Sequence, residues 1–236
     1  MGAGLRHPAT GGELMATAIA ETQHAAEFLI SCANLTRAME QEELAAGNDL
    51  EAGAVLGKYT SDASSSAAGG SNTGDGAMGA ATIGDDARVG DYIVLITAAA
   101  TNAGDFSVTD PVGTVIGTGT VAVLFDATGI MSFTLADGAA DFIIGDTFTI
   151  TVTAVTGKVA ELDPDASTGI EAAVGVLLAT TDTSDLTEGS RQVTMVARDA
   201  EVGIDELKWE ATVTAGEKVT ALAELDALGI IARVQG

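Results

Sequence analysis

The sequence predicts an α+β protein that is mostly β: a β-rich host domain with one C-terminal helix, interrupted by an inserted antiparallel module like a sandwich or barrel. Three observations predict it. Aromatic residues make up only 4% of the 236 residues, whereas 29 glycines and many threonines favour short strands and tight turns over a helical bundle. Short apolar runs separated by turn residues recur through the middle of the chain. One strong helix signal lies near the C-terminus.

The N-terminal segment divides into a polar leader and a short apolar run. Residues 1–26 hold too few large apolar side chains to fold alone, so we predict a flexible arm. Phe28-Leu29-Ile30 then opens the first part of the host domain, residues 27–60, in which Val55-Leu56 begins a strand after the turn residue Gly53. A leader of this kind can add a strand to the sheet edge of another protein. The alternative is an ordinary N-terminal strand of the host domain.

The middle of the chain is expected to hold a linker and an insert. Residues 61–80 are Ser, Gly, Ala and Asn with almost no large apolar side chain, which predicts a flexible linker or long loop. Residues 81–155 form the expected insert, because every acid there is an aspartate and the only base is Arg88, unlike in the flanking segments. The strands expected in the insert span residues 92–97, 106–109, 114–116, 121–125, 131–135 and 148–155.

Residues 156–236 supply the second part of the host domain. Thr214 and Glu217 form a capping box, in which Thr214 caps the amide of Glu217 and Glu217 reaches back. The helix that begins there is expected to run to about Leu228 and to end at Gly229. The helix side chains expected to face the core are Val219, Leu222 and Leu225. Strands are expected at residues 172–178, 192–198 and 230–234.

The formal charge of −24, from 34 acidic and 10 basic residues, narrows the expected partners. Nucleic-acid binding needs Lys and Arg that displace counterions from phosphates, and an acidic surface is repelled by anionic membranes, so we expect neither partner. No apolar run approaches the roughly 18 residues of a membrane span, and the N-terminus lacks the layout of a signal peptide. We expect a soluble protein whose charge suppresses self-association; divalent-cation binding by paired Asp side chains is the alternative.

No set of residues supports catalysis, and we expect a protein that is not an enzyme and binds no cofactor. The two histidines, His7 and His24, lie in the expected arm, where nothing holds them in register for acid–base chemistry. Cys32 is the only cysteine, which excludes an internal disulfide, and its expected role is a small buried side chain. Aspartate pairs such as Asp163-Pro164-Asp165 lack the ligand pattern of an EF-hand, so no metal site is expected.

Several short strings occur in a fixed order along the two parts of the host domain. They are Glu27-Phe28-Leu29-Ile30-Ser31, residues 50–58, residues 173–177 followed by an acidic loop, Leu207-Lys208-Trp209 and residues 227–233. Their order and spacing together resemble the lambda-type bacteriophage head decoration family. Residues 99–104 and 136–142 are similar to an inserted β-module of longer members of that family.

The resemblance implies a structural virion protein on the outer surface of the expanded capsid, present in the host cytoplasm before assembly. Its partners would be the major capsid protein and further copies of itself, as a homotrimer at three-fold positions that resists the pressure of packaged DNA. The capsid-docking arm implied by position comprises Met15, Ile19, His24, Glu27, Phe28, Leu29, Ile30 and Ser31, with the three consecutive apolar residues as its anchor. Trp209, the only tryptophan, is expected either to fill the core beneath the helix or to anchor a subunit interface.

Two other functions are alternatives to this one. An adhesive or carbohydrate-binding β-sandwich would use the insert, and a cluster of exposed aromatic side chains there would favour it. Most aromatic residues of the insert alternate as core residues should; they are Tyr92, Phe106, Phe125, Phe133, Phe142 and Phe148. The second rival is a hydrolase that uses pairs of aspartates, for which no supporting motif is present.

Overall fold

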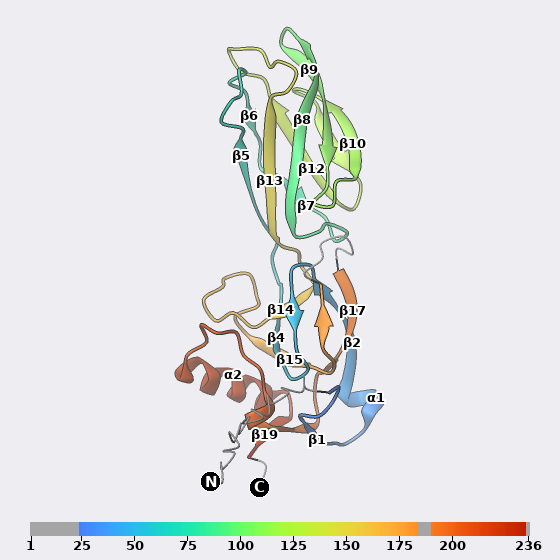
Figure 1. Ribbon diagram of the computed structural model, residues 1–236, viewed down its shortest axis with the longest axis vertical. Helices are drawn as coiled ribbons and strands as arrows, with labels where there is room; N and C mark the ends of the chain where they lie inside the picture. Colours follow the sequence, from blue (N-terminus) through green and yellow to red (C-terminus); the bar gives the residue numbers. More distant parts are fainter. Residues whose placement is uncertain (1–23, 184–189, 235–236) are drawn as a thin grey trace, which may run out of the picture.

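The computed structural model describes residues 24–183 and 190–234. The body is elongated, with two β-rich parts stacked along its long axis (Figure 1). We name residues 61–155 the distal part and the other described residues the basal part. The fold class expected from the sequence is confirmed, because strands dominate and the long helix lies near the C-terminus. No helix among the described residues is long and apolar enough to cross a membrane.

The basal part is built from short strands with helices at its edge. Before the distal part the chain forms β1 (Leu29–Cys32), α1 (Leu35–Ala38), β2 (Met39–Ala45), β3 (Asp49–Leu50) and β4 (Val55–Lys58). After it the chain forms β14 (Val159–Glu161), β15 (Ala173–Leu177), β16 (Thr181–Asp182), β17 (Ser190–Val196), β18 (Ala200–Gly203), the 3-10 turn η2 (Ile204–Glu206), α2 (Ala215–Ala227) and β19 (Ile230–Arg233). Five strands close a barrel in the order β14-β2-β17-β15-β4, and β1-β18-β19 form a separate sheet.

Two clusters of buried side chains fill the basal part. One cluster, which includes Leu44 and Met195, comes mainly from the barrel strands. The other joins the barrel to the three-stranded sheet and to α2, and includes Phe28, Val202 and Leu225. Each cluster therefore combines residues that precede the distal part in the sequence with residues that follow it.

The distal part is a sandwich of two sheets. Its strands are β5 (Ala63–Ala68), β6 (Ala77–Met78), β7 (Thr82–Ile83), β8 (Gly90–Ala100), β9 (Ala103–Thr109), β10 (Val115–Thr120), β11 (Leu124–Ala127), β12 (Met131–Ala136) and β13 (Thr147–Ala154). One sheet has the order β10-β9-β8-β13-β5, and the other has the order β11-β12-β6, with β7 also paired to β12. A single apolar core lies between them, in which the rings of Phe106, Phe125 and Phe133 are 5.0–5.9 Å apart.

The expected strands of the insert bury alternate side chains. In β8, Tyr92 and Val94 are buried and Ile93 is exposed, as a half-buried strand requires. The strands expected at 92–97, 106–109, 131–135 and 148–155 are confirmed, and the one expected at 114–116 begins β10. The strand expected at 121–125 is wrong in its first half, because Ala122 has a φ of 63° and turns the chain before β11.

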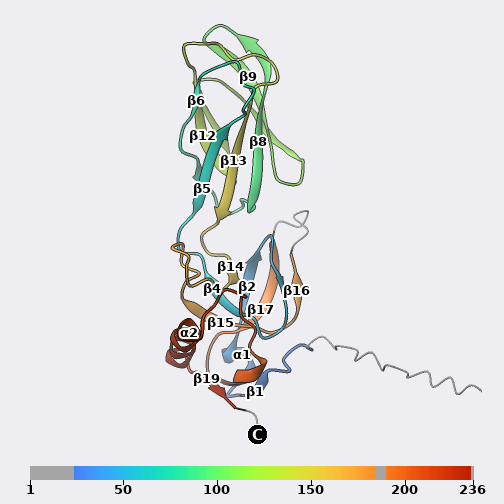
Figure 2. The ribbon, with the colours of Figure 1, turned by 60° about the vertical axis from the view of Figure 1, so that its left-hand side comes forward.

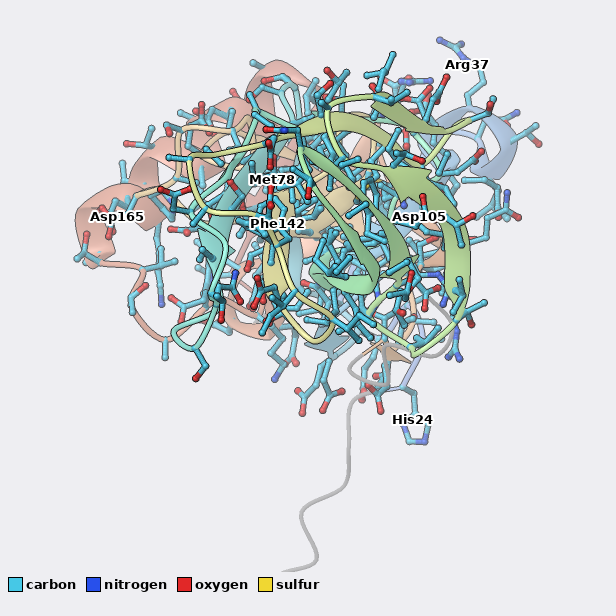
Figure 3. All side chains as sticks on the ribbon, turned by 90° about the horizontal axis from the view of Figure 1, so that it is seen from above. His24, Arg37, Met78, Asp105, Phe142 and Asp165 are labelled. Carbon is cyan, nitrogen blue, oxygen red and sulfur yellow. The ribbon has the colours of Figure 1, made fainter. Side chains whose placement is uncertain are left out.

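Residues 61–80, expected to be a flexible linker, are instead part of the sandwich. β5 pairs along its whole length with β13, and β6 pairs with β12. Between them, the backbone at Gly74 and Gly76 lies against the ring of Phe142, and a Cβ on Gly76 would come within 2.4 Å of a ring carbon. Phe142 and Met78 belong to the same core (Figure 3). Here, small residues allow close backbone approach rather than flexibility.

The division of the chain into a host and an insert stays a prediction, and the cores suggest new limits for it. The buried members of the distal cluster lie between Ile83 and Val155, whereas the members of the two basal clusters come before Lys58 or after Lys158. Because β5 also pairs with β13 along its length, we propose an insert that starts with β5 instead of at residue 81.

Helix α2 begins where the sequence predicts. The Glu217 amide donates to Thr214 Oγ1 (3.4 Å) and the Thr214 amide donates to Glu217 Oε2 (2.7 Å), so the capping box is confirmed. Leu225 is buried and Leu222 packs against the same core, as expected. Val219, also expected to face the core, is exposed. With 3.6 residues per turn, it lies about 120° around the helix from Leu225, which places it on the solvent side.

Asp146 is a buried carboxylate that holds the loops at the far end of the sandwich together. It accepts hydrogen bonds from the backbone amides of Thr73 (2.9 Å), Gly74 (2.9 Å) and Ile143 (3.1 Å). Burial by itself would raise the pKa of Asp146, but the bonds from these amides outweigh burial and hold its pKa below the ordinary value.

The substitution Asp146→Ala is expected to lower the free energy of unfolding by about 2–5 kcal/mol, because three amides lose their acceptor. Since the folded-state pKa is lowered, this stabilisation is fully present above the unfolded-state pKa of about 4 and is lost as the pH falls through the folded value. Urea unfolding at neutral and acidic pH measures both effects, with Asp126→Ala at an exposed position on β11 as the control. Equal stability of the two variants at neutral pH would contradict the assignment.

Candidate functional site

The end of the basal part that lies away from the distal part carries β1 and β19 (Figure 1, Figure 2). β18 lies between them, antiparallel to β1 and parallel to β19. In the described chain each of the two outer strands pairs with β18 alone, so one edge of each is not covered by another strand. The terminal face is our name for the solvent side and the two edges of this sheet, together with Val234. It comprises residues 29–32, 200–203 and 230–234.

A row of polar side chains ties the three strands of the terminal face together. Glu201 on β18 accepts from the Ser31 hydroxyl on β1 (2.9 Å) and from Arg233 Nε on β19 (2.6 Å). Hydrogen bonds from Arg233 and Ser31 hold the pKa of Glu201 below its ordinary value. A shallow depression beside this row is lined by Ser31, Cys32, Ala33, Asp199, Ala200, Glu201, Gly229 and Ile231. These polar groups have partners within the sheet, so they maintain the sheet's shape.

Exposed aliphatic side chains accompany the polar row. Ile30 on β1 is 44% exposed, and Ile231 and Val234 at the other edge are also exposed. Leu35 on the neighbouring helix α1 is exposed as well. Large aliphatic side chains gathered at one end of a soluble protein mark a contact surface more often than isolated ones do. The terminal face thus combines apolar side chains with open strand edges.

The outer residues of the expected docking arm fall into two groups. Met15 and Ile19 lie outside the described residues. His24 and Glu27 are exposed and belong to one turn, in which the His24 amide donates to Glu27 Oε2 (2.9 Å). The imidazole Nδ1 of His24 is 3.8 Å from the same carboxylate, and the side chain projects from the body (Figure 3).

The apolar run that follows does not act as one unit. Phe28 is fully buried in the basal core and Leu29 packs against it, whereas Ile30 and Ser31 are exposed. Strict alternation would place Phe28 and Ile30 on the same side, but the pairing of β1 with β18 shifts register between Leu29 and Ser31. Because of this bulge, Phe28 points into the core and Ile30 points toward solvent. The Phe28 ring therefore serves the protein's own core.

A backbone contact fixes where the N-terminal segment joins the body. The Ala26 amide donates to the carbonyl oxygen of Leu178 (2.8 Å), just beyond β15. The Leu29 amide donates to the Ala26 carbonyl oxygen (3.0 Å), and the Gly203 amide donates to that of Phe28 (2.8 Å). Residue 26, expected to be the last of the flexible arm, is therefore attached to the body.

Trp209 contacts the basal core. Its ring is partly buried against the cluster that contains Leu225, and Lys218 Nζ of α2 lies 5.6 Å from the ring centroid. A cation at this distance from an indole face is attracted to it. These contacts are those of a side chain beneath the helix; its alternative role at a subunit interface stays a prediction.

The residues weighed for metal or acid–base chemistry are dispersed. Cys32 is partly buried on β1, and His24 is exposed. Asp163 accepts from the Asp165 amide (3.0 Å), which makes this pair a local turn. Within residues 24–183 and 190–234, no three His, Cys, Asp or Glu side chains are grouped so that they could hold a metal ion.

Comparisons with known proteins bear on the role of this surface. No curated protein matches the chain. Two crystal structures of Xanthomonas campestris FlgL match with a TM-score of 0.31 and identities of 20% and 22%. Each match covers 44% of this chain and 33% of FlgL, and a similarity this low carries no conclusion about fold or function.

The family model for bacteriophage lambda head decoration protein D matches residues 18–230. The matched region includes the described elements from β1 to α2, with the distal part between them, and it ends at the first residue of β19. Because this match spans most of the chain, the protein belongs to the bacteriophage lambda head decoration protein D family and is a structural protein of the phage head.

Proposed function

We propose that the protein binds the exterior of the expanded capsid through its terminal face and the segment before His24. As a trimer at three-fold positions, it stabilises the shell against the pressure of packaged DNA. The observation that carries the proposal is the family match over residues 18–230. The open strand edges and exposed aliphatic side chains at one end of the molecule support it.

Strand addition is the docking mechanism that this end favours. A segment that adds to a sheet edge gains a ladder of backbone hydrogen bonds, and neighbouring side chains supply specificity. The bond between Ala26 and Leu178 attaches the start of the described chain to the body, next to β1. We infer that the segment before His24 pairs with the major capsid protein, and that Ile30 and Ile231 cover the junction.

Attachment through the terminal face directs the distal part away from the shell, because the two lie at opposite ends of the molecule (Figure 2). Residues 61–155 contain eleven aspartates and a single base, Arg88. An outer layer of that charge repels other virions and keeps them apart in solution.

Repetition around the shell reduces the affinity that each contact needs. Many identical copies, each also joined to two neighbours in a trimer, convert a modest contact into a stable assembly. Trp209 is our candidate for a subunit contact, because part of its ring is left uncovered by the basal core.

The burial of aromatic side chains counts against the adhesive alternative. All six aromatic residues of the distal part are at most 5% exposed, so they cannot stack on a sugar ring; they are Tyr92, Phe106, Phe125, Phe133, Phe142 and Phe148. The feature that would favour a carbohydrate-binding surface in this part is therefore missing from the described residues.

Sedimentation with purified shells tests the proposed function. Full-length protein mixed with expanded, undecorated shells is expected in the pellet, and the bound amount is expected to saturate at a fixed ratio to the capsid protein. Unexpanded shells serve as the control and should pellet less of the protein. If the protein stays in the supernatant with intact expanded shells, the proposal is wrong.

A further inference from the structure

Lys158 is a buried lysine at the junction of the two parts, and the proposed function makes no use of it. It is 4% exposed, and its Nζ donates to the carbonyl oxygen of Ala87, 2.7 Å away. Ala87 belongs to the core of the distal part, whereas Val159, the next residue after Lys158, belongs to a basal cluster. A single side chain therefore links the two cores.

The charges around this lysine also come from both parts. Burial lowers the pKa of Lys158, while Glu43 of β2 and Asp86 and Asp85 of the distal part act in the opposite direction. Arg88 adds to the lowering. An ammonium group is costly to bury unless hydrogen bonds and opposite charges surround it. Here the groups that compensate this cost are brought together only when the two parts are in contact.

The two chain segments that cross the junction are bonded to each other. The Tyr59 amide donates to the Lys158 carbonyl oxygen (2.9 Å), and the Gly157 amide donates to that of Tyr59 (2.9 Å). The Thr156 amide donates to Asp62 Oδ1 (2.7 Å). The two segments thus form a short two-stranded ladder. Such a ladder resists stretching and twisting, but it can still bend out of the plane of its two strands.

We propose that the Lys158 side chain is a strut that joins the distal and basal parts into one rigid unit. Its contact at Ala87 is separate from the two crossing segments, since Ala87 is in the connection between β7 and β8. This third attachment opposes bending at the crossing. The distal part is thereby held in one orientation on the basal part, whether or not the protein is bound to a shell.

The test compares Lys158→Met with Lys58→Met in the full-length protein. Methionine keeps an unbranched apolar stem and removes the ammonium. Lys58 is the matched control, because it pairs with Val159 on the adjacent strand β14 and its Nζ donates to Glu42 (2.9 Å) within the basal part. Limited proteolysis reports on bending, because cleavage follows the population of the open form.

Cleavage at residues 59–62 and 155–158 is expected to accelerate by about ten- to a hundredfold in Lys158→Met, the loss typical of a hydrogen bond from a charged group. It is expected to stay at the wild-type rate in Lys58→Met. Small-angle X-ray scattering should show a broader distance distribution for Lys158→Met alone. Equal cleavage and equal scattering of the two variants would overturn the proposal.

Hydrogen exchange of the unmodified protein keeps the proposal testable if Lys158→Met does not fold. The amides of Tyr59 and Gly157 are expected to exchange about as slowly as those of the adjoining strands β4 and β13. Fast exchange at the junction, with β4 and β13 still protected, would show a flexible hinge and overturn the proposal.

Discussion

Removal of residues 1–23 is expected to weaken binding to expanded shells by about a hundredfold or more, because several backbone hydrogen bonds of about 1 kcal/mol each would be lost. The melting temperature should not change, since the cut spares Phe28 and the contact of Ala26 with Leu178. Co-sedimentation over a range of protein concentrations measures the first quantity, and thermal unfolding measures the second.

The position of the cut decides what this experiment can show. A chain that begins at Ser31 lacks Phe28, which is fully buried, and also loses the pairing of Leu29 with Val202. Its failure to bind would have two explanations, an absent arm or a damaged body. If the chain that begins at His24 binds as well as the full-length protein, strand addition by the arm is ruled out even though the protein decorates shells.

The substitution Phe28→Ala is expected to lower the free energy of unfolding of the basal part by about 3–5 kcal/mol. The ring lies in the cluster formed with Val202, Leu225 and Ile230, where its removal leaves a cavity between the three-stranded sheet and the helix. Denaturant unfolding followed by circular dichroism measures the change. A loss below about 1 kcal/mol would mean that Phe28 is not part of this core.

Ile30→Ala is the matched control for Phe28→Ala, two residues along the same segment. Its side chain is 44% exposed on the terminal face, so the expected change in stability is under about 1 kcal/mol. Binding to expanded shells is expected to fall by roughly tenfold, as for an apolar side chain at the centre of an interface. Phe28→Ala should therefore lower mainly stability, and Ile30→Ala should lower mainly binding to shells. The opposite result would mean that Ile30 supports the core and Phe28 the contact with the shell.

The features that could be predicted from the sequence have local signals. The capping box of Thr214 and Glu217 locates the start of α2 with neighbouring residues alone. Strand β13 alternates between polar and apolar residues, and β8 contains a continuous apolar run from Tyr92 to Ile96, so both could be identified without knowledge of their partners. In such elements, the order of apolar and polar residues indicates a strand without reference to distant parts of the chain.

Strand β2 had no such signal, because its acidic residues depend on distant partners. Glu42 forms an ion pair with Lys58, and Glu40 forms one with Arg198. The strand runs along β17, with Met39 opposite Val196, and this pairing closes the barrel. The pairing with β17, which lies more than 100 positions later in the chain, decides its structure, and composition does not reveal that pairing.

The candidate site shows the same limit. The sequence indicates that the run at Phe28 to Ile30 is β-prone, but not which side chain is buried. That depends on pairing with β18, about 170 residues later, and on the bulge between Leu29 and Ser31. Likewise, the small residues near Gly74 and Gly76 resemble a linker until the ring of Phe142 is placed against them.

Electron cryo-microscopy of expanded shells saturated with the protein tests the central claim most directly. We predict density in groups of three at the three-fold positions, with β1 and β19 against the shell and the distal part pointing away from it (Figure 1). A reconstruction in which the distal part contacts the shell and the terminal face is exposed to solvent would contradict the proposed orientation.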